Sequence, residues 1–503
     1  MSIIKLAHNA VTAKLIDAPR EAKLEAQRLL SYQVTGVEHM PAFTSGNWDG
    51  RASFFDFTNG TFPRGFVTRV THGLAKSGFQ VQLIRKPFPP ALGPENPVVD
   101  SFPIDDRYEY QSRVVDSLLR HGQIIAQVAT GGGKSRIAKL ATARIARPTL
   151  FLTTRGVLMY QMSDGFASLG KKIAILGDGN LETSKGVTCG MVQTIMSWLK
   201  EPDVGVSSDA KVRAAKKRAA MIQVLERFEF IILEEAHESS GNSYYEILRH
   251  CKNAHYRLAL TATPFMKDSE ESNMRLAASS GPIAIRVSEE TLIDRGILAK
   301  PYFKFVEVKG KVDKLFRSTP WQRAYELGIT HNTARNLHVV DECVRASKYG
   351  LSVMVLVQRR EHGTILNDLL AKAGLSARYI FGDDNQTERT SALSALKSGK
   401  LDVLIGSTIL DVGVDVPAVG MVILAGGGKA EVALRQRIGR GLREKKSGPN
   451  VAFIVDFADG FNTHLKGHYK QRRSIIESTE GFNKNIVEDF DFIGLGLKIK
   501  NGV

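Results

Sequence analysis

The sequence predicts an α/β protein in which two lobes, each built on a parallel β-sheet, follow a small α+β domain. The first observation is length, because 503 residues are too many for a single hydrophobic core. The second is that apolar, strand-like runs alternate with helical periods from Tyr108 onward, as parallel α/β layers require. The third is that this alternation forms two series, the second beginning after Pro301. The repeated rhythm predicts two similar lobes in tandem.

Residues 1 to about 85 instead alternate apolar and polar side chains as short β-strands do. Asn59 and Gly60 follow an aromatic run, and this pair tolerates the positive φ values of a tight hairpin turn. Six prolines between residues 87 and 103 then exclude a helix or a central strand, which is typical of a linker. We expect an N-terminal α+β accessory domain, a Pro-rich linker, lobe 1, lobe 2 and a basic C-terminal extension over residues 1–86, 87–104, 105–298, 299–465 and 466–503.

Short apolar runs mark the expected strands of both lobes. Those of lobe 1 are residues 124–128, 150–153, 173–176, 187–191, 228–233 and 256–260. Those of lobe 2 are residues 353–357, 378–381, 403–405, 421–424 and 451–457. A helix is expected over residues 136–145.

The net charge indicates the kind of binding partner, and the cysteine content indicates the cellular compartment. The chain carries 68 Lys and Arg against 52 Asp and Glu, a formal net charge of +16, which favours nucleic acid as the partner over a merely soluble basic protein. Cys189, Cys251 and Cys343 are widely spaced and lack CxxC or His partners, so we expect buried thiols in a reducing compartment and neither disulfides nor zinc. No apolar run reaches the roughly 18 residues of a membrane span, so a soluble, cytoplasmic protein is expected.

Aromatic and basic side chains gather around Trp48 and Arg51 in the N-terminal segment. The other members of this set are Phe54, Phe62, Arg64 and Arg69. They form either a surface that stacks bases and contacts phosphates or the core of a small β-rich domain. We assign Trp48 and Arg51 to nucleic-acid binding.

A phosphate-binding loop is predicted between the expected strand at 124–128 and the helix at 136–145. Its residues are Thr130, Gly131, Gly132, Gly133, Lys134 and Ser135. Glycines let backbone N–H groups turn toward phosphate oxygens, Lys134 reaches the outer phosphates and the Ser135 hydroxyl can ligate Mg²⁺. Taken alone, the stretch could be a glycine-rich turn with a chance Gly-Lys-Ser. The expected cofactors are ATP and Mg²⁺.

Acidic residues follow a buried-strand run in the same lobe. Glu234 and Glu235 come after residues 228–233, at the carboxyl end of a strand, where Mg²⁺ and the attacking water must be held. We assign Glu234 to Mg²⁺ through water and Glu235 to polarising the attacking water. Thr261 and Thr263 close the next expected strand, and their hydroxyls could relay the nucleotide state between lobes.

A basic box lies in lobe 2. Residues 436–443 carry three arginines at a spacing of three, which could form one basic helix face. Guanidinium groups that face a γ-phosphate neutralise transition-state charge and can be worth about 10³ or more in rate. The order of phosphate loop, acidic pair, Thr-Ala-Thr and arginine box along the chain favours this second interpretation.

With these motifs, the chain resembles a superfamily 2 helicase with two RecA-like lobes over residues 108–459. The resemblance implies that Gln111 reads adenine, that Gln436 faces the nucleotide or the lobe interface, and that Arg440 and Arg443 are arginine fingers. It also implies that segments of both lobes hold the nucleic-acid backbone, through Thr154, Arg155, Gln193, Thr194 and Thr408. Two positions depart from the family pattern. Val128 stands where the longer phosphate loop has glycine, and Glu234 is one methylene longer than the usual Asp.

Further motifs resemble phage recombination and repair DNA helicases. They are residues 46–51 ahead of an aromatic run, residues 361–363 and residues 387–389. This likeness implies ATP-driven remodelling of branched DNA, with branched or forked duplex and single-stranded DNA as partners, and we expect a monomer. DNA translocases and the motor subunits of restriction enzymes are the next relatives.

Two other functions stay open: an RNA helicase, and a nucleic-acid-binding or annealing module whose ATPase has decayed, for which Glu234 is the suggestive feature. Basic runs at 211–218 and 464–473 either touch phosphates or form solvated faces. A nuclease is disfavoured, because residues 202–211 resemble a nuclease metal motif but lack the strand that would aim its carboxylates.

Overall fold

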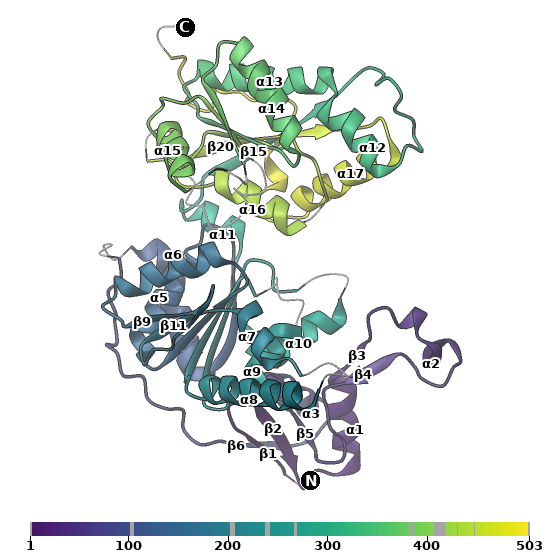
Figure 1. Ribbon diagram of the computed structural model, residues 1–503, viewed down its shortest axis with the longest axis vertical. Coiled ribbons are helices and arrows are strands. Elements are labelled where there is room, and N and C mark those ends of the chain that lie inside the picture. The colour runs from purple at the N-terminus through teal and green to yellow at the C-terminus, as the bar shows by residue number, and fades with distance from the viewer. Residues whose placement is uncertain are drawn as a thin grey trace. The chain divides into compact units, whose positions relative to one another are not determined.

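The computed structural model describes residues 3–100, 105–201, 207–236, 242–265, 269–381, 384, 386–406, 418–429, 431–446 and 448–500. The chain divides into two compact units (Figure 1). Unit 1 comprises Met1–Val128 and Gly133–Arg286, and unit 2 comprises Ala129–Gly132 and Val287–Val503.

The N-terminal part of unit 1 is a four-stranded sheet in the order β5-β2-β1-β6. Its strands are β1 (Ile4–His8), β2 (Thr12–Ile16), β5 (Thr61–Pro63) and β6 (Val81–Ile84). The helices are α1 (Arg20–Leu29) and α3 (Val67–Lys76). Alternating residues of β1 and β2 point inward and are buried with the apolar faces of both helices, as an amphipathic pattern requires.

This N-terminal part shares its core with the lobe that follows. Phe54 lies 5.6 Å from Tyr245, ring centroid to ring centroid, and Met274 is buried in the same cluster. A Cβ on Gly65 would lie 2.1 Å from the Ala277 carbonyl oxygen, so only glycine allows this approach. The two parts therefore pack as one body.

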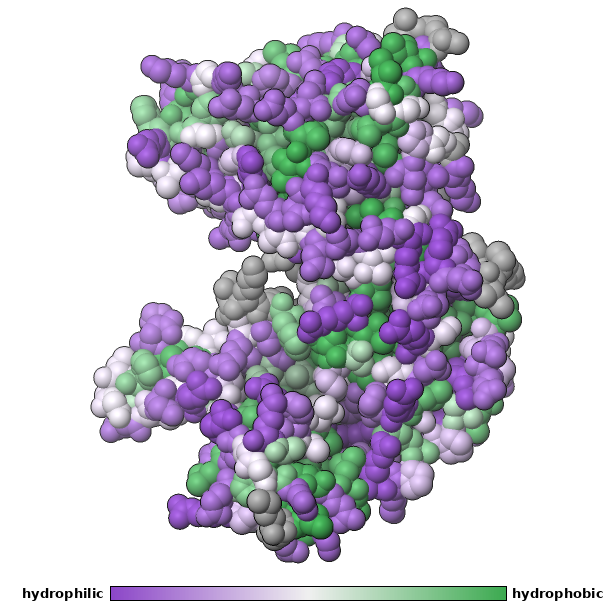
Figure 2. Space-filling view, turned by 180° about the vertical axis from the view of Figure 1, so that it is seen from behind, coloured by the Kyte–Doolittle hydropathy of each residue, from purple (hydrophilic) through white to green (hydrophobic). Residues whose placement is uncertain are grey.

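A projecting segment runs through β3 (Ser31–Gln33), α2 (Pro41–Thr44) and β4 (Arg51–Ser53) (Figure 1). Met40 and Phe43 on it are 37% and 36% exposed, and hydrophobic surface appears there among hydrophilic residues (Figure 2). The backbone N–H groups of Gln33 and Thr35 donate to the carboxylates of Glu270 and Glu271, at 2.8 and 3.3 Å. These bonds anchor the base of the segment to α10 (Glu270–Ser280).

The turn at Asn59 and Gly60 exists, but it is not the predicted tight hairpin. Gly60 has φ +68° and donates its N–H to the Asp56 carbonyl at 2.8 Å, while Asp56 and Thr61 form an isolated bridge. The Asp56 carboxylate accepts three hydrogen bonds from Thr58 and Asn59, which fixes a longer turn. The flanking strands pair elsewhere, β4 with β3 and β5 with β2.

The main sheet of unit 1 has eight strands in the order β10-β9-β11-β8-β12-β13-β7-β14. They are β7 (Gln123–Val128), β8 (Thr149–Thr153), β9 (Ile173–Gly177), β10 (Asn180–Leu181), β11 (Val187–Met191), β12 (Phe230–Glu234), β13 (Tyr256–Thr261) and β14 (Ile283–Val287). The helices are α4 (Glu109–His121), α5 (Lys134–Ile145), α6 (Gly156–Ala167), α7 (Val192–Leu199), α8 (Ser208–Leu225), α9 (Asn242–Arg249) and α10. One core cluster joins the strands to α7, α8 and α9, and Phe151 packs on Phe166 of α6.

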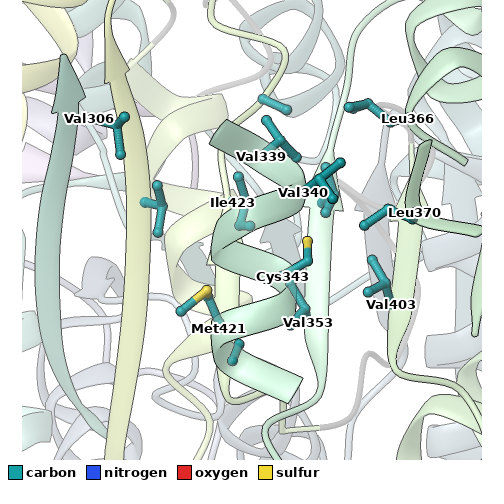
Figure 3. Packing of buried hydrophobic residues seen from close by; sticks show 14 of the residues in the cluster. Val306, Val339, Val340, Cys343, Val353, Leu366, Leu370, Val403, Met421 and Ile423 are labelled. Carbon is teal, nitrogen blue, oxygen red and sulfur yellow. The ribbon is translucent and has the colours of Figure 1, made fainter. Parts of the chain in front are cut away.

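The sheet of unit 2 has seven strands in the order β17-β18-β16-β19-β20-β15-β21. They are β15 (Lys300–Glu307), β16 (Val353–Leu356), β17 (Ala377–Ile380), β18 (Val403–Gly406), β19 (Met421–Ile423), β20 (Val451–Ala458) and β21 (Ile486–Val487). The helices include α11 (Glu289–Asp294), α12 (Trp321–Tyr325), α13 (Thr333–Lys348), α14 (Arg360–Lys372), α15 (Gln386–Lys397), α16 (Glu431–Gly441) and α17 (Thr463–Glu477). Side chains of α13 and α14 pack on the strands, as Figure 3 shows for Val339, Val340, Cys343, Leu366, Leu370, Val353, Val403, Met421 and Ile423.

All predicted lobe strands are confirmed to within about two residues, and so is the predicted α/β class. The strands β10, β14, β15 and β21 were not predicted. The three cysteines are free and buried, as expected, and burial raises the pKa of Cys189 to about 12. Within the described ranges, no helix is both long and apolar enough to cross a membrane.

Candidate nucleotide site and nucleic-acid surface

The predicted phosphate loop connects β7 to α5. Gly131 and Gly133 adopt φ values of +88° and +79°, which L side chains rarely tolerate. A Cβ on Gly133 would also lie 2.5 Å from Nε2 of Gln111. Lys134, the first residue of α5, is buried, and its Nζ lies 3.5 Å from the Val128 carbonyl. The loop therefore has the backbone conformation that a phosphate cradle needs.

Gln111 lies beside this loop, on α4. Its side chain is buried, and its Oε1 accepts a 2.9 Å hydrogen bond from Nη1 of Arg136, on the first turn of α5. The structure thus brings the expected adenine-reading residue next to the phosphate loop, although the two lie far apart in the sequence.

Glu234 is the last residue of β12 and is buried. Burial and, to a lesser degree, the neighbouring Glu235 raise the pKa of its carboxyl, the Lys134 ammonium lowers it, and the net pKa is about 8. Its Oε2 atom has no hydrogen-bond partner in the described part of the chain. Glu235 follows with φ +47°, a strained value for a non-glycine residue.

Sheet order explains why the motifs meet. Strands β12 and β13 pair in parallel with Glu234 opposite Leu260, and β13 pairs in parallel with β7 with Thr261 opposite Gln127. The carboxyl ends of three adjacent strands therefore carry the acidic pair, the Thr-Ala-Thr turn and the phosphate loop on one edge.

Thr261 and Thr263 form a compact turn at this edge. The Thr263 N–H donates to Oγ1 of Thr261 at 3.2 Å, and Thr261 is fully buried. Oγ1 of Thr263 is buried without a hydrogen-bond partner among the described residues. A hydroxyl held in this way is available to a group that arrives with the nucleotide.

These residues fit a magnesium nucleotide. The buried Oε2 of Glu234 needs an electropositive partner, since an unsatisfied buried carboxylate oxygen is costly. Ser135, next to Lys134, adds a half-buried hydroxyl of the kind that ligates Mg²⁺. Among the described residues, no group of three or more His, Cys, Asp or Glu side chains could hold a metal without further ligands. Phosphate and water oxygens would complete the coordination.

A second set lies at the ends of β8 and β11, which pair in parallel with Met191 opposite Thr153. Nε2 of Gln193 donates to the Thr154 carbonyl at 3.0 Å. Gln193 is exposed, and Thr154, Arg155 and Thr194 are half-buried. The structure therefore gathers these four residues on one accessible edge.

Trp48 and Arg51 are held together in the projecting segment. The Trp48 indole N–H donates to the Arg51 carbonyl at 2.8 Å, and the Arg51 guanidinium donates to the Ser31 carbonyl and lies 3.9 Å from Glu270. Arg51 has an exposed side chain, so contact with a nucleic acid is sterically open.

Of the remaining members of that set, Phe54, Phe62 and Arg64 form core, whereas Arg69 is exposed. Phe62 is buried, and Phe54 packs between Tyr32 and Phe66. Arg64 is also buried, donates to the His255 carbonyl at 3.0 Å, and has its pKa lowered to about 9 by burial. The phosphate-contact interpretation is therefore wrong for Arg64, because its guanidinium joins the N-terminal part to the first lobe.

In unit 2, Gln436 and Arg440 belong to α16, but their side chains, like the whole of Thr408, lie outside the described residues. Arg443 follows the helix, is half-buried, and forms a backbone bridge with Leu298.

The basic run at the C-terminus is only partly a surface. Arg472 is buried, and its guanidinium makes two hydrogen bonds to the Asp456 carboxylate, at 2.8 and 2.9 Å. Arg473 pairs with Glu477 at 2.8 Å. A phosphate contact by Arg472 is therefore excluded by its burial and its pairing. Helix α8, in contrast, keeps Lys211, Arg213 and Lys216 exposed.

A second glycine run, Gly426 to Gly428, lies just before the arginine box and was not predicted to be functional. The signal was present, since three glycines follow a buried strand as they do in the phosphate loop.

Two family models match the chain. The model described as "Type III restriction enzyme, res subunit" matches residues 106–266, and the "Helicase conserved C-terminal domain" matches residues 335–445. The first falls in the lobe that carries the phosphate loop and the second in the lobe that carries the arginine box.

Similar proteins include helicases of viruses. The "ATP-dependent DNA helicase uvsW" of Enterobacteria phage T4 is 22% identical over 492 residues, 92% of this chain and 91% of that protein. A Sulfolobus islandicus filamentous virus protein named as a helicase is 22% identical over 72% of this chain, which spans about two thirds (65%) of that relative. The DNA-bound structure of DUF1998 helicase MrfA has a TM-score of 0.52 at 15% identity, over 75% of this chain and 54% of that one.

Matched relatives also include a DNA translocase and an RNA helicase, so nucleic-acid helicase is the description that they share. The two parallel-sheet lobes, the ordered motifs and both family models agree. The chain therefore belongs to the superfamily 2 helicases, with two RecA-like lobes.

Proposed function

We propose that this chain is an ATP-dependent DNA helicase or translocase that remodels branched DNA in recombination, repair or replication. The observation that carries the proposal is the extent of the similarity to a relative named as an ATP-dependent DNA helicase, 92% of this chain. Such an extent includes residues outside both family models, in the N-terminal part that holds Trp48 and Arg51. The net charge of +16 suits a polyanionic substrate.

ATP and Mg²⁺ are the proposed cofactors. Bound Mg²⁺ would neutralise charge on the outer phosphates. Lys134 reaches the same phosphates as a point charge, the Ser135 hydroxyl and Glu234 hold the ion, Glu234 acting through water, and the backbone of residues 130–133 lines the phosphate groups. Glu235 accepts a hydrogen bond from the attacking water, and so orients and polarises it.

Gln111 and Gln436 recognise the nucleotide in this proposal. Arg440 and Arg443 stabilise the negative charge that develops on the transferred phosphoryl group. Thr261 and Thr263 sense the nucleotide state, since Thr263 has a buried hydroxyl at the edge that carries the acidic pair.

The nucleic-acid backbone contacts Thr154, Arg155, Gln193 and Thr194 on unit 1 and Thr408 on unit 2. Hydroxyl, amide and guanidinium groups at strand ends are suited to phosphate oxygens, which position a strand without reading its sequence. Trp48 offers an aromatic face and Arg51 a cation, the combination that binds unpaired nucleotides.

Strand displacement tests the proposal against an RNA helicase. A labelled forked DNA and an RNA duplex of the same sequence are incubated with the wild-type chain, ATP and Mg²⁺, and Lys134→Ala is the matched inactive control. We expect displacement of the DNA strand that requires Lys134 and exceeds that of RNA. Displacement of RNA alone would select the RNA helicase, and equal DNA annealing by both proteins without unwinding would select the decayed module.

A further inference from the structure

The segment from Ala425 to Gly428 joins β19 to α16 in unit 2, and every one of its four carbonyls accepts a hydrogen bond from a side chain. The donors and distances are Arg335 to Ala425 (2.6 Å), Tyr325 to Gly426 (2.8 Å), Gln358 to Gly427 (3.1 Å) and Arg472 to Gly428 (2.9 Å). The donors come from α13, α12, the loop between β16 and α14, and α17, so four separate parts of the lobe fix this short segment.

Two buried ion pairs fix two of these four donor side chains, which together we call the carbonyl clamp. Arg335 pairs with Asp459 at 2.8 Å, with both side chains at most 1% exposed, and Arg472 pairs with Asp456 at 2.8 Å. Each buried arginine is thus neutralised by a carboxylate and still donates to a loop carbonyl. Burying two ion pairs is costly, and the segment that they hold in place exposes backbone groups to a cavity.

The segment presents backbone N–H groups. Gly427 and Gly428 have φ values of +62° and +98°, and a Cβ on Gly428 would lie 2.4 Å from Nε2 of Gln358. In a trans peptide the N–H points opposite to the C=O, so clamping the carbonyls aims the N–H groups of residues 427–429 the other way. None of these three N–H groups has a hydrogen-bond partner in the described part of the chain. Successive free N–H groups in such a turn form a concavity that binds anions.

A cavity of 250 Å³ adjoins the segment. Its lining residues include Gly427, Gly428, Lys429, Arg437, His468 and Trp321. The ring centroids of Trp321 and His468 lie 4.3 Å apart, and α12 and α17, which carry them, lie side by side (Figure 1). A water occupies about 30 Å³ of liquid, so the cavity has room for an oxyanion with several waters.

The cavity is electropositive. Lys429 is exposed, and no described carboxylate pairs with it, while Arg437, which is 8% exposed, adds a guanidinium group to the lining. The pKa of His468 is lowered by burial and then by Lys429, Arg472 and His464. Nδ1 of His468 is buried and has no hydrogen-bond partner among the described residues. The only carboxylates that face Arg472, Asp456 and Asp459, are already paired within the described structure.

We infer that this cavity binds a phosphate group of a nucleic-acid strand, held by the N–H groups of residues 427–429, Lys429 and His468. The site lies within unit 2, and its residues do not include Thr408, the contact that the sequence predicts for that lobe. The same chemistry would also accept free phosphate. The choice of a nucleic-acid strand as the ligand therefore rests on the proposed function. A strand is favoured because the exposed Lys429 leaves the ammonium within reach of a long polyanion.

Binding of a fluorescein-labelled oligo(dT) to the full chain, followed by anisotropy over a range of salt concentrations, tests the inference. Lys429→Gln should weaken binding about fivefold at low salt and reduce the slope of log K against log salt by about 0.7, the value of one phosphate contact on a single strand. Lys372→Gln is the matched control, since Lys372 is an exposed lysine on α14 of the same unit. It should bind as the wild type does.

Trp321 reports occupancy of the cavity directly. The chain has three tryptophans, so a Trp48→Phe, Trp198→Phe protein keeps Trp321 as its single tryptophan. Phenylalanine at position 48 keeps an aromatic face in the projecting segment, and this double variant is the reference for the titrations that follow. Oligo(dT) should change its emission, and Lys429→Gln in this background should shift the titration to higher concentrations. Inorganic phosphate at the same ionic strength is the comparison.

Three outcomes decide between the alternatives. Unchanged affinity and salt slope in Lys429→Gln would overturn the site while leaving DNA binding intact. A Trp321 response to inorganic phosphate but not to oligo(dT) would make it a small-anion site and also overturn the inference. A wild-type chain that binds neither oligo(dT) nor oligo(U) would contradict the proposed function itself.

Discussion

Lys134 lowers the pKa of Glu234, but burial and the neighbouring Glu235 outweigh it and hold that pKa near 8. The two residues start α5 and end β12, on the edge where the phosphate loop and the acidic pair meet. Lys134 alone does not compensate the charge of the buried Glu234 carboxylate, so the ionised form of Glu234 requires a further positive charge such as Mg²⁺.

Replacement of Lys134 separates hydrolysis from nucleic-acid binding. Lys134→Ala should abolish ATP hydrolysis, because the point charge on the outer phosphates is lost, and should leave oligo(dT) affinity largely intact. Steady-state turnover and anisotropy on the same preparation measure both. An equal loss of the two activities would remove Lys134 from the phosphate site.

Glu234 tests whether a longer acid can serve Mg²⁺. Glu234→Asp should keep most of the turnover or raise it, whereas Glu234→Gln, which loses the charge, should lower it strongly. Mg²⁺-dependent hydrolysis in the three proteins is the measurement. Background turnover in the wild type together with activity in Glu234→Asp would show a silenced motor.

The same residue gives a pH-dependent stability. Because burial raises its pKa from 4.5 to about 8, the folded protein favours the neutral carboxyl, and the stability penalty is absent below pH 4.5 and grows as pH rises to 8. Glu234→Gln is neutral throughout, so without nucleotide it should be more stable than wild type by a few kcal/mol at pH 8 to 9 and equal near pH 4.5. Urea unfolding at both pH values measures the difference. A constant difference would refute the raised pKa.

Arginine fingers act on the transition state more than on binding. Arg440→Ala or Arg443→Ala should lower kcat by about 10² or more and change nucleotide affinity little. Arg435→Ala is the matched control on the same helix, because the Arg435 guanidinium pairs with Glu289 at 3.2 Å. Wild-type turnover in both finger variants would exclude them from the mechanism.

Sequence predicted the lobe strands because buried parallel strands are continuous apolar runs, as at residues 228–233. It missed β15 because Pro301 near its start, together with Lys300 and Lys304, resembles a boundary more than a strand inside the sheet. The order of β12, β13 and β7 within the sheet, which brings the motifs together, is a property of long-range pairing that local pattern does not contain.

Charge in the sequence does not reveal burial. Arg64 and Arg472 look like neighbours of phosphate in a basic chain, yet each is buried and bound to carbonyls or a carboxylate of another element. The carbonyl clamp could not be predicted either. Tyr325 and Arg472 lie far apart in the sequence and come together only where both donate to the loop of residues 425–428.

ATP hydrolysis by the wild-type chain with and without forked DNA tests the central claim most directly. We expect turnover that requires Mg²⁺, rises several-fold or more on addition of forked DNA, and rises less with RNA of the same sequence. Turnover at background level under all three conditions would contradict the central claim.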